Sequence, residues 1–87
     1  MQKQGYVEGY TTFTSMDGLA EGVLGLLEKR PHSIWEVHRK ISKSSVRQRM
    51  PGYSFFTLVN VIENLAVNGF VEAPTRELTR EDIIQSI

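Results

Sequence analysis

Apolar residues recur at helical spacing in the first third of the chain. Leu19, Val23 and Leu27 lie four positions apart, so they share one face of a helix that we expect to run from about residue 15 to residue 30. Ser15 and Asp17 precede this run, and either side chain can accept a hydrogen bond from an unpaired amide of the first turn. Three glycines, each of which costs a helix about 1 kcal/mol relative to alanine, indicate either close packing against another backbone or simple tolerance: Gly18, Gly22 and Gly25.

A second helix is predicted directly after Pro31, because the residue before a proline is disfavoured in the helical conformation. Ser33 and Glu36 have the spacing of a capping box, in which each side chain bonds the other residue's backbone amide. The helix has a narrow apolar stripe, formed by Ile34, Val37 and Ile41. Trp35 flanks this stripe, and we expect it to be a core anchor.

The third predicted helix follows a polar and basic connector, residues 42–53, which includes a capping-box spacing at Ser45 and Gln48. Ser54 can cap a helix that runs to residue 68, and Gly69 can adopt the left-handed conformation that ends helices. The expected inner face consists of Phe55, Leu58, Ile62, Leu65 and Ala66. The other face consists of Phe56, Thr57, Asn60, Glu63, Asn64 and Val67.

The last part of the chain predicts a short β hairpin and a final helical segment. Residues 70–72 are expected to form a strand, and Pro74 fits the second position of a tight turn that returns the chain as a strand at 77–79. Thr79 can then cap a helical segment, which carries Ile83, Ile84 and Ile87. The expected fold class is therefore mainly α with a small β hairpin.

Length and composition limit the chain to a single domain. The 87 residues are 40% hydrophobic, which suits one modest core, assigned to residues 16–87. Residues 1–15 are expected to be an N-terminal arm or strand. The absence of a long apolar run or a signal-like start predicts a cytoplasmic protein without a membrane segment. Without cysteine there is no disulfide and no thiolate zinc site, so packing alone must stabilise the fold.

The motifs in this order resemble those of the PadR family of transcriptional regulators. The segment VLGLLEKRP, residues 23–31, is similar to the end of the family's first helix, and SIWEVHRKI, residues 33–41, to its second helix. The segment TLVNVIENLAVNGFVE, residues 57–72, is similar to the recognition helix and first wing strand. Together these stretches cover about half of the chain. The resemblance implies a winged helix-turn-helix fold with a three-helix core and a short wing.

The sequence also departs from the family pattern. Val59 stands where a tyrosine is common, Phe56 where a small residue is common, and only Arg76 is basic at the wing tip. The family's long C-terminal dimerisation helix has no counterpart. If the protein is a homodimer, we expect the N-terminal arm or the Ile83, Ile84 and Ile87 segment to form the interface.

These expectations make duplex DNA the predicted partner, with the third helix in the major groove. The side chains expected to contact bases are Ser54, Phe56, Thr57, Asn60 and Asn64. The net charge is zero, but between Arg30 and Arg49 six Lys or Arg side chains stand against Glu36 alone. The side chains expected to contact phosphates are Arg39, Lys40, Lys43, Arg47, Arg49 and Arg76.

An alternative function belongs to a different class. Phe56 and Val67 lie on the expected outer face of the third helix, so this face can instead bind a protein within a larger assembly. An enzyme is not expected, because His32 and His38 are six residues apart and no carboxylate pattern completes a metal triad. We expect His32 to lie in a loop and His38 to be half-buried. The sequence predicts no catalytic residues, no metal and no cofactor.

Overall fold

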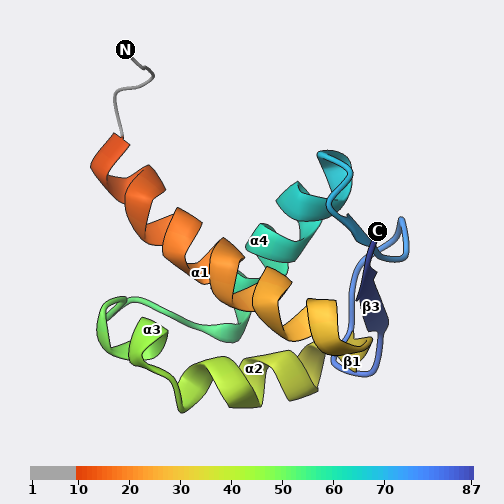
Figure 1. Ribbon diagram of the computed structural model, residues 1–87, viewed down its shortest axis with the longest axis horizontal. Helices are drawn as coiled ribbons and strands as arrows, with labels where there is room; N and C mark the ends of the chain where they lie inside the picture. The colour runs from red at the N-terminus through yellow and green to blue at the C-terminus, as the bar shows by residue number, and fades with distance from the viewer. Residues whose placement is uncertain (1–9) are drawn as a thin grey trace.

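The protein is mainly helical, with a small three-stranded antiparallel sheet (Figure 1). The computed structural model describes the backbone of residues 10–87 and the side chains of residues 18–87. Its elements in chain order are α1 (Tyr10–Lys29), β1 (His32–Ser33), α2 (Ile34–Ser42), α3 (Ser45–Gln48), α4 (Phe55–Val67), β2 (Val71–Glu72) and β3 (Ile83–Ser86). Within the described residues no helix is both long and apolar enough to cross a membrane.

The start of α1 differs from the prediction. The helix begins at Tyr10, so Ser15 and Asp17 lie inside it and neither residue is its N-cap. Residues 10–15 of the predicted arm are therefore helical, and residues 1–9 lie outside the described part of the chain. The end of α1 at Lys29 agrees with the expectation.

The following helices begin at serine caps. Ser33 accepts a hydrogen bond from the amide of Glu36 at 3.1 Å and caps α2, as predicted, although the Glu36 carboxylate binds Arg30 instead of closing the box. In the connector the cap of α3 is Ser44, one residue before the predicted position, and its hydroxyl accepts from the amide of Val46. Each cap satisfies an amide that the first helical turn leaves without a partner.

Helix α4 has the predicted boundaries. Ser54 is its N-cap and Asn68 its C-cap. Gly69 follows with φ +84°, a backbone conformation that is energetically unfavourable for any residue with a Cβ atom. The cap at Asn68 and the turn at Gly69 direct the chain away from the helix and into β2.

The sheet corrects the predictions for the last part of the chain. Its strand order is β1-β3-β2, and both pairs are antiparallel, with His32 opposite Ile84 and Val71 opposite Ser86. The predicted final helix is wrong, since residues 83–86 form the central strand. The predicted return strand at 77–79 is also wrong, because β2 pairs with β3 and residues 73–82 connect the two strands.

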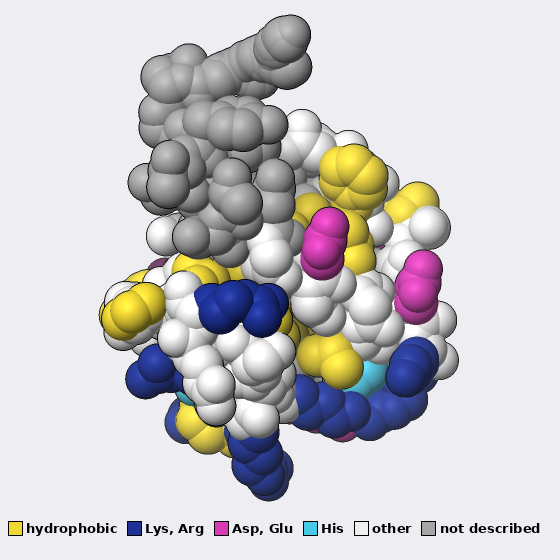
Figure 2. Space-filling model, turned by 60° about the vertical axis from the view of Figure 1, so that its left-hand side comes forward, with side chains coloured by type: hydrophobic (Ala, Val, Ile, Leu, Met, Phe, Trp, Pro, Cys, Tyr) yellow, Lys and Arg dark blue, Asp and Glu magenta, His cyan; other side chains and the backbone are white. Residues whose placement is uncertain are grey.

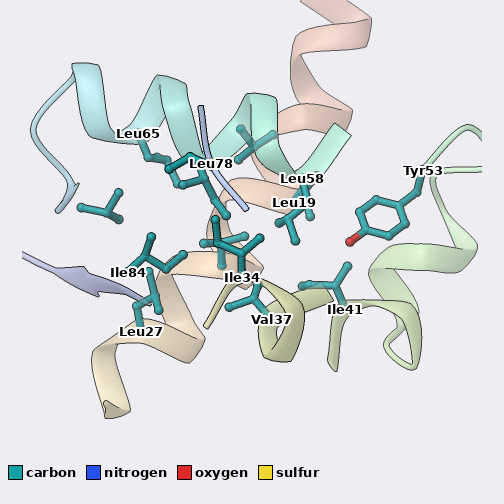
Figure 3. Close-up of a cluster of buried hydrophobic side chains, with 14 residues drawn as sticks. Leu19, Leu27, Ile34, Val37, Ile41, Tyr53, Leu58, Leu65, Leu78 and Ile84 are labelled. Atoms are coloured by element: carbon teal, nitrogen blue, oxygen red, sulfur yellow. The ribbon is translucent and has the colours of Figure 1, made fainter. Parts of the chain in front are cut away.

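A single hydrophobic core joins the helices to the sheet (Figure 3). Leu19 of α1 lies beside Leu58 of α4, and Leu27 of α1 lies beside Ile84 of β3. Each of these side chains is at most 3% exposed, and burying a side chain of this size contributes about 1.5–3 kcal/mol. The central strand thus supplies a core residue, Ile84, although the sequence pattern had placed it in a helix.

Two packing expectations from the sequence need revision. A Cβ atom at Gly22 would lie 3.2 Å from Cδ1 of Ile41, so the close contact at this glycine is with a side chain and not with another backbone. Nothing lies within 4 Å of the corresponding position at Gly18 or Gly25. Trp35 is not a core anchor, since 40% of its surface is exposed. It follows buried Ile34 directly, and successive helical residues point about 100° apart.

Candidate nucleic-acid interface

Four side chains form the outer stripe of α4: Phe56, Asn60, Glu63 and Val67. All four are exposed, and the opposite face of the helix is buried in the core. Of the side chains expected to contact bases, Phe56 and Asn60 lie on this stripe, with Phe56 78% exposed. Asn64 is exposed on the flank of the stripe. Side chains at these positions can reach a partner that lies along α4.

The other two residues expected to contact bases are engaged in the cap of α4. The Ser54 hydroxyl accepts from the Thr57 amide at 3.3 Å, and the Thr57 hydroxyl accepts from the Ser54 amide at 3.2 Å. These two reciprocal hydrogen bonds provide acceptors for two backbone amides that have no partner within the first turn of α4. Ser54 and Thr57 therefore hold the helix end in position, and a base contact would compete with that role.

Helix α2 presents one of its sides to the beginning of α4. The rings of Trp35 and His38 lie 6.3 Å and 5.5 Å from the ring of Phe55, measured between centroids. His38 Nδ1 also lies 2.8 Å from the hydroxyl of Tyr53, just before α4. Burial lowers the pKa of His38 and raises the pKa of Tyr53 to about 12, so both groups are neutral near pH 7. As expected, His38 is half-buried.

The other side of α2 faces the end of α1. There His32 is only 2% exposed and belongs to β1, which corrects the expectation of a loop residue. Its Nε2 lies 3.1 Å from Nζ of Lys40, and its Nδ1 lies 2.8 Å from the carbonyl oxygen of Arg30. An ammonium group can only donate, so Nε2 accepts and Nδ1 carries the proton that is donated to Arg30. Lys40 is thereby held on the side of α2 that faces away from α4.

The remaining predicted phosphate contacts divide into two groups. Arg39, Lys43, Arg47 and Arg49 are exposed, and none of them forms an ion pair with another described residue. Figure 2 shows Lys and Arg side chains gathered over the lower part of one face of the molecule. Arg76 is different, because both of its terminal nitrogens bind the carboxylate of Asp82, at 2.8 Å and 2.7 Å. The geometry places Arg76 in a structural ion pair of the β2–β3 connection.

Sequence reasoning missed one basic residue, which lies beside Trp35 at the start of α2. The guanidinium of Arg80 lies 5.0 Å from the ring centroid of Trp35, and its carbonyl oxygen accepts from the Trp35 amide at 3.0 Å. Arg80 comes from the β2–β3 connection, so its position depends on how residues 73–82 return to the start of α2. The only signal in the sequence was that Arg80 directly follows Thr79, the residue expected to cap a helix.

Among the side chains of residues 18–87 there is no cluster of three or more His, Asp or Glu able to hold a metal ion. The apolar residues proposed for a dimer interface are also separated, since Ile84 is fully buried while Ile83 and Ile87 are 58% and 77% exposed. Ile84 therefore cannot contribute to an interface in this fold.

Comparisons of this chain with known proteins identify no relative. No protein family, no curated protein and no solved structure matches the chain.

Proposed function

We propose that this chain is a winged helix-turn-helix domain that binds duplex DNA and regulates transcription. Support for the fold comes from the order of its elements, in which a strand between the first two helices pairs with the last strand of the chain. In this reading α4 is the recognition helix, and β2, β3 and their connection form the wing. The resemblance of three segments to PadR regulators points the same way.

The observation that carries the proposal is the distribution of charge around the beginning of α4. No Asp or Glu occurs between Val37 and Ile62, a span that contains most of α2, all of α3 and the first half of α4. This span carries the four exposed basic side chains described above, and Arg80 adds a fifth from the wing. Such a basic surface attracts phosphates and releases their counterions.

The same surface offers groups that can recognise bases. The first turns of a recognition helix usually contact base edges, and here they expose Phe56 and Asn60. An asparagine can bond the N6 and N7 atoms of adenine together, and Phe56 can contact a thymine methyl group. We therefore assign base recognition to Phe56 and Asn60 in the first half of α4, and phosphate contact to the four exposed basic side chains described above and to Arg80.

The test is a fluorescence-polarisation titration of random-sequence duplex DNA at several salt concentrations. Wild type and the double variant Arg47→Ala, Arg49→Ala are compared. Each phosphate contact contributes about 0.9 to the magnitude of the slope of log K against log salt concentration. The double variant loses two contacts, so its slope should be smaller in magnitude by roughly 2.

A matched control removes the basic side chains of the last residue of α1 and of the residue after it, in Lys29→Ala, Arg30→Ala. This control has the same net charge as the test variant and should keep the wild-type slope. Equal slopes in both variants would exclude the α3 surface as the DNA contact, and absence of salt-sensitive binding in wild type would contradict DNA binding itself.

A protein partner on the outer stripe of α4 is the second candidate, and the 78% exposure of Phe56 favours it. However, Phe56 and Val67 lie at opposite ends of the helix, about 16 Å apart along its axis, with Asn60 and Glu63 between them. The apolar surface is therefore interrupted, whereas protein interfaces usually have a continuous apolar patch. This candidate gains support if Phe56→Ser abolishes binding to a partner protein while the fold and DNA binding are unchanged.

A further inference from the structure

A groove runs between the second half of α4 and the segment that follows β2. Its volume is about 790 Å³. The lining includes Ala66 and Val67 of α4, residues 71–78, and Ile87 at the end of the described chain. The groove lies beyond the turns of α4 to which the proposed function assigns DNA contact, so it is a separate surface.

The groove combines an apolar floor with an exposed apolar rim. Val71 and Leu78 line it and are 2% and 7% exposed, so they are fixed in the core. Val67 and Ile87 line it from the rim and are 86% and 77% exposed. The amide of Ile87 donates to the carbonyl oxygen of Phe70 at 3.3 Å, which brings a further exposed aromatic residue beside the rim. Exposed apolar side chains that meet around a groove are typical of binding sites.

Carboxylates surround this apolar surface. Glu63, Glu72 and Glu77 line the groove, and Arg76 is the basic residue among its lining. The guanidinium of Arg76 is already paired with Asp82, so its charge does not offset the three glutamates. The groove is therefore acidic, in contrast to the basic surface around the first half of α4.

We propose that this groove binds a segment of another protein in which a large apolar side chain is flanked by lysine or arginine. The apolar side chain would be buried against Val67, Leu78 and Ile87, where it displaces water from apolar surface. The flanking cations would face the glutamates, and complementary charge selects such a segment over an acidic one. The proposal concerns this groove alone and does not depend on DNA binding.

The test begins with selection of peptides from a random phage-display library on wild-type protein. We expect the enriched peptides to share a large apolar residue with Lys or Arg on both sides. The best peptide is then synthesised with a fluorescein label, and its affinity is measured by fluorescence polarisation. Replacing its apolar residue by serine should weaken binding by at least tenfold.

Variants of the protein locate the site. Val67→Lys removes an apolar contact and adds a repelling charge at an exposed helical position, so it should weaken peptide binding by at least tenfold. Glu63→Gln with Glu77→Gln should weaken binding about tenfold at low salt and less at high salt. The matched control Glu21→Gln with Glu28→Gln removes two exposed carboxylates of α1, and Phe56→Lys changes the other end of the outer stripe. Both controls should keep wild-type affinity.

Several outcomes would overturn the proposal. A library that yields no enriched peptide, or peptides whose affinity is unaffected by Val67→Lys, excludes this groove as a peptide site. Sedimentation that shows a wild-type dimer and a Val67→Lys monomer makes a second copy the occupant instead. Loss of DNA binding in Arg47→Ala, Arg49→Ala has no bearing on these results, so the two proposals can fail separately.

Discussion

At the scale of single residues, the bond between His32 and Lys40 divides the basic side chains of α2. Lys40 is held at the buried imidazole on the α1 side, whereas Arg39 follows Trp35 by four residues and so shares the side that faces α4. Proximity in sequence had grouped Arg39 and Lys40 as phosphate contacts of equal value. Their side chains start in different directions, because adjacent helical residues point about 100° apart, although both line the same shallow hollow on the outer side of α2.

We therefore predict different effects for two neighbouring substitutions. Arg39→Ala should reduce the salt slope of DNA binding by about 1, because it removes a phosphate contact, and Lys40→Ala should leave the slope unchanged. Both variants lose one positive charge, so each controls for the overall charge of the other. An equal decrease in the two titrations would contradict the orientation of α2 proposed for the complex.

Asp82 makes the connection between β2 and β3 sensitive to acid. Its carboxylate accepts bonds from Arg76 and from the amide of Thr79 at 2.8 Å, and these bonds hold its pKa well below the usual value of 3.8. The stabilisation is present above the unfolded-state pKa and is lost as the pH falls through the lower folded-state pKa. We expect Asp82→Asn to lower the midpoint of urea unfolding at pH 7. The difference from wild type should shrink as the pH is lowered from about 5 to about 2, and a constant difference would contradict this account.

Two glycines should respond to alanine in opposite directions. Gly25 lies inside α1, and nothing lies within 4 Å of the position that a Cβ atom would take there, so Gly25→Ala should stabilise the protein by about 0.5–1 kcal/mol. Gly69 has φ +84°, so Gly69→Ala should destabilise it by about 1 kcal/mol. Urea unfolding of both variants measures the two free energies. Shifts of the same sign would mean that one backbone conformation is assigned wrongly.

At the scale of elements, α4 shows how much local sequence determines. Ser54 and Gly69 mark its two ends, and the apolar spacing of Leu58, Ile62 and Leu65 identifies its buried face, all of which the structure bears out. Caps and helical periodicity depend on residues within a few positions of each other, so a single sequence reveals them. The same local information supported the positions of Phe56 and Asn60 on the exposed side.

Strand β3 shows where local information ends. Thr79 and the acidic residues after it are typical of a helix start, and the isoleucine spacing fits one helix face. The segment is nevertheless a strand, because it pairs with β1 on one side and β2 on the other. These partners lie elsewhere in the sequence, and the same long-range return of the chain places Arg80 on Trp35. The basic residue missed at the candidate interface and the misassigned element thus have one cause.

The packing of α4 can be tested with a matched pair of substitutions. Leu65 is 8% exposed within the core, so Leu65→Ala should lower the free energy of unfolding by about 2–5 kcal/mol. Val67 lies on the same helix but is 86% exposed, so Val67→Ala should change the free energy of unfolding by less than about 0.5 kcal/mol. Similar losses in chemical denaturation of the two variants would show that the buried face of α4 is assigned wrongly.

At the scale of the whole molecule, a net charge of zero conceals two surfaces of opposite sign. The acid-free span from Val37 to Ile62 includes the first half of α4, and Glu63, Glu72 and Glu77 line the groove at its second half. DNA should therefore be attracted to one half of α4 and repelled from the other. This division favours a domain that holds DNA and a basic peptide at the same time.

The two proposals together predict a ternary complex. Saturating the protein with duplex DNA should change its affinity for the labelled peptide by less than about twofold, because DNA at the first half of α4 leaves the groove open. Fluorescence polarisation with and without an unlabelled duplex measures this change, provided that the peptide alone does not bind the duplex in a control titration. Competition between peptide and DNA would mean that the duplex also covers Glu63 and Val67. In that case the recognition surface would extend along the full length of α4, and the acidic groove would not be an independent site.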